Sequence, residues 1–415
     1  MNQQPPVRDI QRTPAPARDT ALRLVVSTPL YRGATIALFL SGIGFSAAAP
    51  QIASFLVHQL GASLTVAGLY YLTNLTAPIA GYLVGARSDR TGSRLTLFRL
   101  CAVIGAGGWA AIAVAPRLWL PFVISALLLG FAGAATSQLF AAIHDQAALQ
   151  PHPHQDGVVA IVRMALTAGW VLGPVAGSFL AALAGPRVMF LATAAATLAQ
   201  LLPLGGQRDP GSTPLVSRRP APRTTRPDIR AMLPLLAFTA LYICVYAGEP
   251  VKYAYLPIYM TSQLHFTPAL AGAVIGIQPL VELALMPVAV VVARRTGPMR
   301  VMVLGAGFGV AANLCFAFTA TAAGLFTGQV LMGGVWGVFA TLGIVVAQRL
   351  LPTAVATASA IFISSTALSS ALGGLTGGLG AAWAGLPLVF LVPAAFALAA
   401  VVGLTGMARA QRHPR

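Results

Sequence analysis

Charge is scarce in this sequence, and that scarcity excludes most classes of soluble protein. Of the 415 residues only 8% are charged, whereas 57% are hydrophobic. A soluble domain carries about 25% charged residues, so this chain has too few charges to solvate a globular surface of its size. The mean hydropathy of +0.79 agrees. We therefore expect an all-α membrane protein, in which helices of about 20 apolar residues span the hydrocarbon core.

Acidic residues are rarer still, with nine Asp and Glu against 26 Lys and Arg, which gives a net charge of +17. The basic residues gather in the N-terminal tail, in one central stretch and at the ends of apolar runs. This is the positive-inside pattern of membrane proteins. A nucleic-acid-binding protein needs a solvated basic face, so we expect no nucleic-acid partner. Anionic lipid headgroups are the expected counter-charge.

The sequence also lacks the patterns of metal, disulfide and enzyme sites. Three cysteines lie singly inside apolar runs, without disulfide or metal spacing. A group of His and Asp residues at 144–156 is irregularly spaced, and we expect it in a solvated cytoplasmic loop. No Walker-type loop and no nucleophile–base pattern occurs. We therefore expect no metal, no cofactor, no ATP-driven step and no enzymatic activity.

Twelve apolar runs are long enough to span a membrane, and an even number places both basic tails on one side. We expect residues 1–30 to form a disordered cytoplasmic tail rather than a cleaved signal peptide, because this segment has no apolar core. Residues 409–415 form the second cytoplasmic tail, and a bacterial inner membrane is the expected location. The predicted spans are 33–57, 63–86, 95–115, 118–143, 157–184, 186–204, 231–261, 268–293, 300–320, 323–348, 354–384 and 386–408.

The stretch 205–230 divides the chain into two six-helix halves, 31–204 and 231–408. It is rich in Pro and Arg and cannot bury apolar surface, so we expect a flexible cytoplasmic linker. Arg90-Thr91-Gly92 recurs as Arg295-Thr296-Gly297, each after the second span of its half. Two such halves with a binding site between them are typical of secondary transporters.

A short charged segment, Gly85-Ala-Arg-Ser-Asp89-Arg90-Thr-Gly92-Ser-Arg94, separates the second and third spans. We expect this segment to form a short turn, because its glycines allow a tight backbone turn. We also expect Asp89 either to pair with a neighbouring arginine or to cap a nearby helix. The pattern resembles the signature loop between helices 2 and 3 of the major facilitator superfamily. That resemblance implies that Gly85, Asp89, Arg90, Gly92 and Arg94 take part in gating the cytoplasmic side.

The fifth predicted span contains Gly169, Gly173, Pro174 and Gly177 in the order Gly-x-x-x-Gly-Pro-x-x-Gly. This order resembles the antiporter motif of major facilitator exporters, which implies a gating role and favours efflux. The alternative is a small-residue face that lets two helices pack closely.

Charged residues inside the spans are expensive and are therefore candidates for function. Arg163 either faces a cavity or a carboxylate, or extends to the cytoplasmic interface. Glu249 and Lys252, the only lysine, lie three residues apart in a span broken by two prolines, so they either line a cavity or form a salt bridge at a helix end. Glu282 has no basic residue nearby in the sequence; it either carries protons or is neutral and hydrogen-bonded between helices.

Several segments together resemble the bacterial sugar efflux transporters. The informative ones are Asn74 after Gly68-Leu69-Tyr70-Tyr71, Gln138-Leu139-Phe140-Ala141, Arg163 before Trp170-Val-Leu-Gly173-Pro174, and Glu282. The resemblance implies export of sugars and alkyl or aryl glycosides against a proton gradient. It also implies Asn74, Gln138, Arg163 and Glu282 as substrate or coupling residues. The Glu249–Lys252 pair departs from what we expect of that family.

The sequence therefore predicts a monomeric, twelve-helix proton antiporter that exports sugars or glycosides. Its expected substrate-binding residues lie in both halves, and Glu282 and Glu249 are the expected proton carriers. A multidrug exporter of the same fold is the main alternative, and a membrane sugar sensor is a more distant one. The predicted substrate-binding residues are Asn74, Gln138, Arg163, Trp170, Glu249, Lys252 and Glu282.

Overall fold

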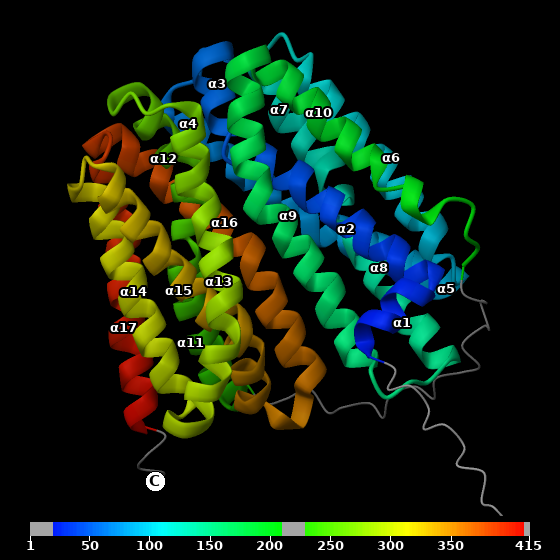
Figure 1. Ribbon diagram of the computed structural model, residues 1–415. Helices are drawn as coiled ribbons and strands as arrows, with labels where there is room; N and C mark the ends of the chain where they lie inside the picture. The colour runs from blue at the N-terminus through cyan, green and yellow to red at the C-terminus, as the bar shows by residue number, and fades with distance from the viewer. Residues whose placement is uncertain (1–19, 210–228, 411–415) are drawn as a thin grey trace, which may run out of the picture.

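The computed structural model describes residues 20–209 and 229–410, and the described part of the chain is helical throughout, without a strand. Figure 1 shows two helical bundles side by side, one from each half of the sequence. The first half comprises α1 Ala21–Ser27, α2 Pro29–Ala48, α3 Ile52–Leu60, α4 Leu64–Leu69, η1 Tyr70–Thr76, α5 Ala77–Thr91, α6 Arg94–Ala113, α7 Trp119–Ile124, η2 Ser125–Leu129, α8 Gly130–Leu149, α9 Gln155–Ala184, α10 Pro186–Ala199 and η3 Leu202–Leu204.

The second half repeats this order of long helices. Its last helix ends close to the level of α1, so both described ends of the chain lie at one end of the molecule, here called the tail-side end (Figure 1). Its elements are α11 Ile229–Tyr246, α12 Gly248–Ile258, η4 Tyr259–Gln263, α13 Pro268–Thr296, α14 Pro298–Phe318, α15 Ala322–Leu350, η5 Pro352–Ala354, α16 Val355–Ala384, η6 Leu388–Phe390 and α17 Leu391–Ala410.

Eleven helices in the described ranges are long and apolar enough to cross a membrane. The predicted second span is the one missing from this set, because its helix is interrupted: α4 passes into the 3₁₀ segment η1 and then into α5. Counting this interrupted run, the structure agrees with twelve spans. The seventh span is broken at Ala247, between α11 and α12, within the proline-containing segment that the sequence pointed to.

The predicted tight turn between the second and third spans lies at Gly92, whose φ of 68° ends α5 in the left-handed conformation that glycine adopts without strain. The helix is longer than the predicted span 63–86, because α5 continues through Gly85 to Thr91. The predicted N-terminal tail is also not disordered throughout, since α1 lies within it and Thr20 accepts a hydrogen bond from the backbone N–H of Arg23. Residues 1–19, 210–228 and 411–415 of the predicted tails and linker lie outside the described residues.

The two halves touch mainly at the end opposite the tails. There Tyr255 donates to the carbonyl of Leu64 at 3.0 Å, and His58 Nε2 lies 3.2 Å from Ser262 Oγ. Gly68 also lies against α16, where an added Cβ would come within 2.9 Å of the Gly374 carbonyl. Toward the tail-side end the bundles diverge (Figure 1). The halves are therefore closed on one side and apart on the other.

Candidate functional site

A cavity of about 880 Å³ lies between the two halves, and we call it the central cavity. It falls within the size range of small-molecule sites, about 300–1,000 Å³. Aromatic rings, apolar side chains and a few polar groups line it, from α2, α3, η1, α5, α6, η2, α8, α9, α11, α12, α13, α15 and α16. The residues that matter below are Tyr70, Tyr71, Asn74, Ser125, Trp170, Tyr246, Glu249, Tyr253, Gln278, Glu282, Trp336 and Ser370.

Two interruptions of regular helix face this cavity from the first half. The 3₁₀ segment η1 and the π-helical segment η2 lie beside each other, joined by a hydrogen bond between the Tyr70 and Ser125 hydroxyls. Irregular backbone at membrane depth is tolerated where it lines a cavity. The Tyr71 hydroxyl is buried and has no hydrogen-bond partner among the described residues. A buried unpaired hydroxyl is costly, so this group can be satisfied by a ligand or water in the cavity.

Glu249 is the centre of the polar network in the second half. Its Oε1 accepts from Lys252 Nζ at 2.7 Å and from Gln278 Nε2 at 3.2 Å, and its Oε2 accepts from Trp336 Nε1 at 2.9 Å. Lys252 has no exposed surface; it also donates to Gln278 and lies 4.2 Å from the centre of the Tyr253 ring. The sequence left two interpretations of Glu249 and Lys252 open, a salt bridge at a helix end and groups that line a cavity. The structure shows both features, because the two residues form a salt bridge and Glu249 reaches the cavity, while Lys252 lies behind it.

Glu282 differs from Glu249 because its carboxylate is not bonded to any residue that the structure describes. It lines the central cavity from α13, is half-buried, and makes no hydrogen bond or ion pair with another described residue. Lys252, the buried cation nearby, is held by Glu249 and Gln278. Glu282 is therefore the cavity carboxylate that is free to receive a proton or a substrate hydroxyl.

Asn74 and Trp170 also line the cavity, as predicted for binding residues. Asn74 Nδ2 donates to Ser370 Oγ across the two halves at 2.7 Å, and Ser370 Oγ lies 3.4 Å from the carbonyl of Tyr71. The Trp170 ring lies 5.6 Å from that of Phe45. Asn74 thus bridges the halves at the cavity wall, and its side-chain oxygen is free for a ligand.

Three other predicted binding residues do not line this cavity. Gln138 is buried on α8 and accepts from Ser88 Oγ at 2.5 Å. Arg163 is exposed on α9, with its guanidinium 5.5 Å from the centre of the Phe140 ring, and it makes no ion pair with a carboxylate that the structure describes. Lys252 lies behind Glu249. The structure places these residues in packing and charge networks around the cavity instead of on its surface.

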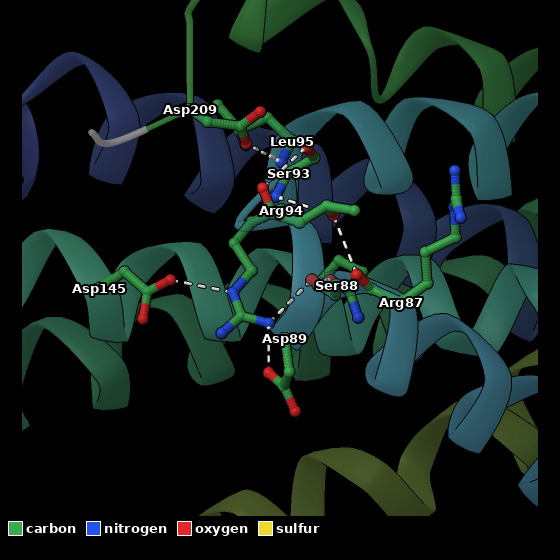
Figure 2. Close-up of polar contacts among 10 residues, drawn as sticks. Arg87, Ser88, Asp89, Ser93, Arg94, Leu95, Asp145 and Asp209 are labelled. Carbon is green, nitrogen blue, oxygen red and sulfur yellow. Dashed lines mark hydrogen bonds and ion pairs between the residues drawn. The ribbon is translucent and has the colours of Figure 1, made fainter. Parts of the chain in front are cut away.

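The charged segment at the end of α5 forms a cluster of four residues, Ser88, Asp89, Arg94 and Asp145, which we call the Arg94 cluster (Figure 2). Arg94 donates to Asp89 at 2.7 Å, to Ser88 at 2.8 Å and to Asp145 at 2.9 Å. Of the two alternatives for Asp89, pairing with an arginine is therefore the one observed. The expectation for Asp145 was wrong: it lies on helix α8, not in a solvated loop, and bonds Arg94.

Asp209, in the predicted linker, closes the N-terminus of α6 next to this cluster (Figure 2). Its carboxylate accepts from the Leu95 backbone N–H at 2.5 Å and from the Thr96 hydroxyl at 3.3 Å. Ser93, the N-cap residue, makes no side-chain cap bond. A carboxylate at this position satisfies a free N–H and complements the positive helix end. Arg99 also holds the carbonyls of Gly205 and Gln207.

The glycines of the fifth span are contact points between helices. An added Cβ at Gly169 would lie 2.5 Å from the Phe39 carbonyl of α2, and one at Gly177 would lie 2.7 Å from the Ala47 carbonyl. Pro174 remains inside the helix, and its carbonyl would lie 2.9 Å from a Cβ added at Gly272 of α13. The segment thus joins α9 to α2 on one side and to the second half on the other, which agrees with the packing interpretation and is compatible with gating.

Sequence reasoning missed several residues of the site. Gln278, Ser370 and Ser125 are isolated polar residues inside apolar runs, and their positions relative to Glu249, Asn74 and Tyr70 depend on helices distant in the sequence. Asp145 and Asp209 did carry a signal. Both are among only nine acids, and Asp209 lies at the start of a segment rich in arginine. In the described ranges no group of His, Cys, Asp and Glu could hold a metal ion.

The model of the Major Facilitator Superfamily matches residues 34–255 and 238–415 of this chain. Sugar efflux transporter A of Escherichia coli K12 is 25% identical over 365 residues, which cover 85% of this chain and 90% of that protein. Sugar efflux transporter A of Dickeya chrysanthemi is 26% identical over 367 residues, or 82% and 86% of the two chains.

Among solved structures, the nucleoside transporter NupG superposes with a TM-score of 0.76 at 17% identity, covering 92% of this chain and 99% of NupG. An identity this low supports the fold alone.

Proposed function

This chain belongs to the Major Facilitator Superfamily, and we propose that it is a secondary active exporter of sugars or glycosides that works by proton antiport. The similarity to sugar efflux transporters along more than four-fifths of the chain supports a sugar transporter. The observation that carries the proposal is the central cavity, which places Asn74, Glu282 and aromatic faces from both halves around one space. Amides and carboxylates bond sugar hydroxyls, and ring faces stack on the apolar face of a sugar or aglycone.

Transport follows alternating access, in which the two halves rock about this cavity. In the conformation described here the halves are closed at the end opposite the tails and apart at the tail-side end, so the cavity receives its substrate from the tail side. With the tails in the cytoplasm of a bacterial inner membrane, this is the loading conformation of an exporter. The Arg94 cluster holds α5, α6 and α8 together as one body while the halves move. One chain contains both halves and the whole cavity, which supports a monomer.

Proton coupling is assigned to Glu282. Glu282 lines the cavity without a hydrogen bond or ion pair to a described residue, so it can lose and regain a proton without breaking a contact within that part of the chain. Glu249, the other acid considered, is bonded by Lys252, Gln278 and Trp336, so its protonation would break a salt bridge. Entry of a proton at Glu282 displaces the sugar hydroxyl that this carboxylate binds, which links release of the sugar to uptake of the proton.

Export of apolar drugs by the same fold is the second candidate function, and the aromatic lining of the central cavity favours it. The decisive experiment is counterflow of radiolabelled lactose and glucose in proteoliposomes, with and without an imposed pH gradient. We expect exchange of at least one sugar and faster exchange with the gradient. Absence of exchange together with proton-driven movement of a cationic dye would replace the sugar proposal by the drug proposal.

A further inference from the structure

A second cavity, of about 370 Å³, lies between the halves at the end opposite the tails, and we call it the outer vestibule. It shares no lining residue with the central cavity. The first half contributes residues of α3 and Ser178 of α9. The second half contributes residues of η4 and the first turns of α13. Its polar lining comprises Gln51, Ser54, His58, Gln59, Thr261 and Ser262, together with Ser178.

The chemistry of this lining selects a neutral, hydroxyl-rich ligand. Among the described residues no Asp, Glu, Lys or Arg lines the vestibule, so this lining offers no carboxylate, ammonium or guanidinium group to an ion. It offers two amides, hydroxyl groups and one imidazole, which both donate and accept hydrogen bonds. Ala182, Pro186 and Pro268 add apolar surface. Hydrogen-bonding groups around an apolar floor suit a sugar ring, and the volume falls within the range of small-molecule sites, about 300–1,000 Å³.

Several of these groups keep free hydrogen-bonding capacity. Gln51 uses its amide N–H₂ on Ser178, at 2.9 Å, which leaves its side-chain oxygen available. Gln59 is exposed and makes no side-chain hydrogen bond with a described residue. Thr261 bonds only the carbonyls of its own helical turn, at 2.9 Å to Pro257. The vestibule therefore presents unpaired donors and acceptors from both halves toward one space.

We propose that the outer vestibule is a second saccharide site, which binds the exported sugar from the far side and holds the transporter in its present conformation. This inference rests on the proposed function for the identity of the ligand. A sugar in the vestibule contacts both halves where His58 and Ser262 already join them. A ligand that binds one conformation better shifts the population toward it. Sugar accumulated on the far side therefore slows further export.

The test measures occupancy of the vestibule directly. Thr261→Cys is placed in a background in which Cys101, Cys244 and Cys315 are replaced by alanine, and the purified protein is labelled with a maleimide at rising lactose concentrations. Gln263→Cys is the matched control, because Gln263 is exposed two residues further on and does not line the vestibule. With lactose at ten times its dissociation constant, labelling of Thr261→Cys falls by about tenfold, while labelling of Gln263→Cys is unchanged.

Two further measurements distinguish lactose binding in the outer vestibule from lactose binding in the central cavity. Thr261→Cys is also labelled in a protein that carries Asn74→Trp, which fills part of the central cavity, and the protection by lactose persists there. Protection that disappears with Asn74→Trp comes from the central cavity and overturns the inference. Lactose counterflow is measured on the same preparations. Counterflow without protection overturns the vestibule alone, whereas absence of both counterflow and protection overturns the proposed function together with it.

Discussion

At the scale of single residues, the two glutamates of the protein have opposite surroundings. Glu249 is bonded on both oxygens and neutralises the fully buried Lys252. Glu282 faces the same cavity and bonds none of the residues that the structure describes. Removing one partner of a buried ion pair leaves an uncompensated charge, whereas removing an isolated carboxyl group leaves none. The first glutamate therefore supports the fold of the site, and the second is available for transport chemistry.

Glu249→Gln is expected to destabilise the protein strongly, because it leaves Lys252 buried without a counter-charge. The expected loss is about 3–5 kcal/mol, measured as a lower midpoint of thermal unfolding of the detergent-purified protein. The double variant Glu249→Gln/Lys252→Met removes both charges and should recover much of that loss. An unfolding midpoint of Glu249→Gln equal to that of the unmodified protein would contradict the structural role of this pair.

Glu282→Gln is expected to abolish the acceleration of counterflow by a pH gradient while the protein stays folded. The amide keeps the size and hydrogen bonding of the side chain but cannot exchange a proton at neutral pH. Rates are compared in proteoliposomes with and without the gradient, and the unfolding midpoint serves as the control for folding. A gradient effect that survives in Glu282→Gln would move proton coupling to another residue.

At the scale of elements, the connection between α5 and α6 lies beside the first residues of the predicted linker, 205–209. Gly92 ends α5, the Arg94 cluster fastens α6 to α8, and Asp209 caps α6. The residues 205–209 therefore follow a fixed course along the first half instead of starting a flexible linker at 205. Each contact is short-range, and together they keep the tail-side ends of three helices in one arrangement.

Asp209→Ala is expected to lower stability by about 0.5–2 kcal/mol, the usual cost of losing an N-cap. The Leu95 N–H and the Thr96 hydroxyl lose their acceptor. Gln207→Ala is the matched control, because Arg99 bonds the backbone carbonyl of Gln207, which alanine retains. Thermal unfolding of both variants measures the difference. Equal midpoints would show that the cap contributes nothing to the stability of α6.

At the scale of the whole molecule, small residues decide how closely the two halves approach. Gly68 of α4 meets Gly374 and Gly378 of α16, and Gly272 of α13 meets Val175 of α9. Side chains at these glycines would hold the backbones apart. Because these contacts lie on the closed side of the central cavity, their geometry controls whether that side shuts.

Gly68→Leu is expected to prevent closure opposite the tails, because even its Cβ would lie 2.9 Å from the Gly374 carbonyl. Counterflow should be lost, and maleimide labelling of Thr261→Cys should become faster as the vestibule opens. Gly307→Leu on α14 is the matched control, since nothing lies within 4 Å of a Cβ at that position. Normal counterflow in Gly68→Leu would show that the close contact of α4 with α16 is not needed for transport.

The sequence alone determined the membrane environment, the twelve spans, the two halves and the superfamily, because these depend on hydropathy, charge distribution and local motifs. It also predicted Glu249, Glu282, Asn74 and Trp170 as binding residues, because polar or aromatic groups in apolar runs stand out, and all four line the central cavity. Only the tertiary structure decided which groups share a space. Gln138 and Arg163 do not line the cavity. Asp145 bonds Arg94 in the Arg94 cluster, and Asp209 caps α6 next to it. Trp336 donates a hydrogen bond to Glu249. These pairings depend on how helices distant in the sequence are rotated and packed against each other, and the hydropathy of the sequence does not determine that rotation or packing.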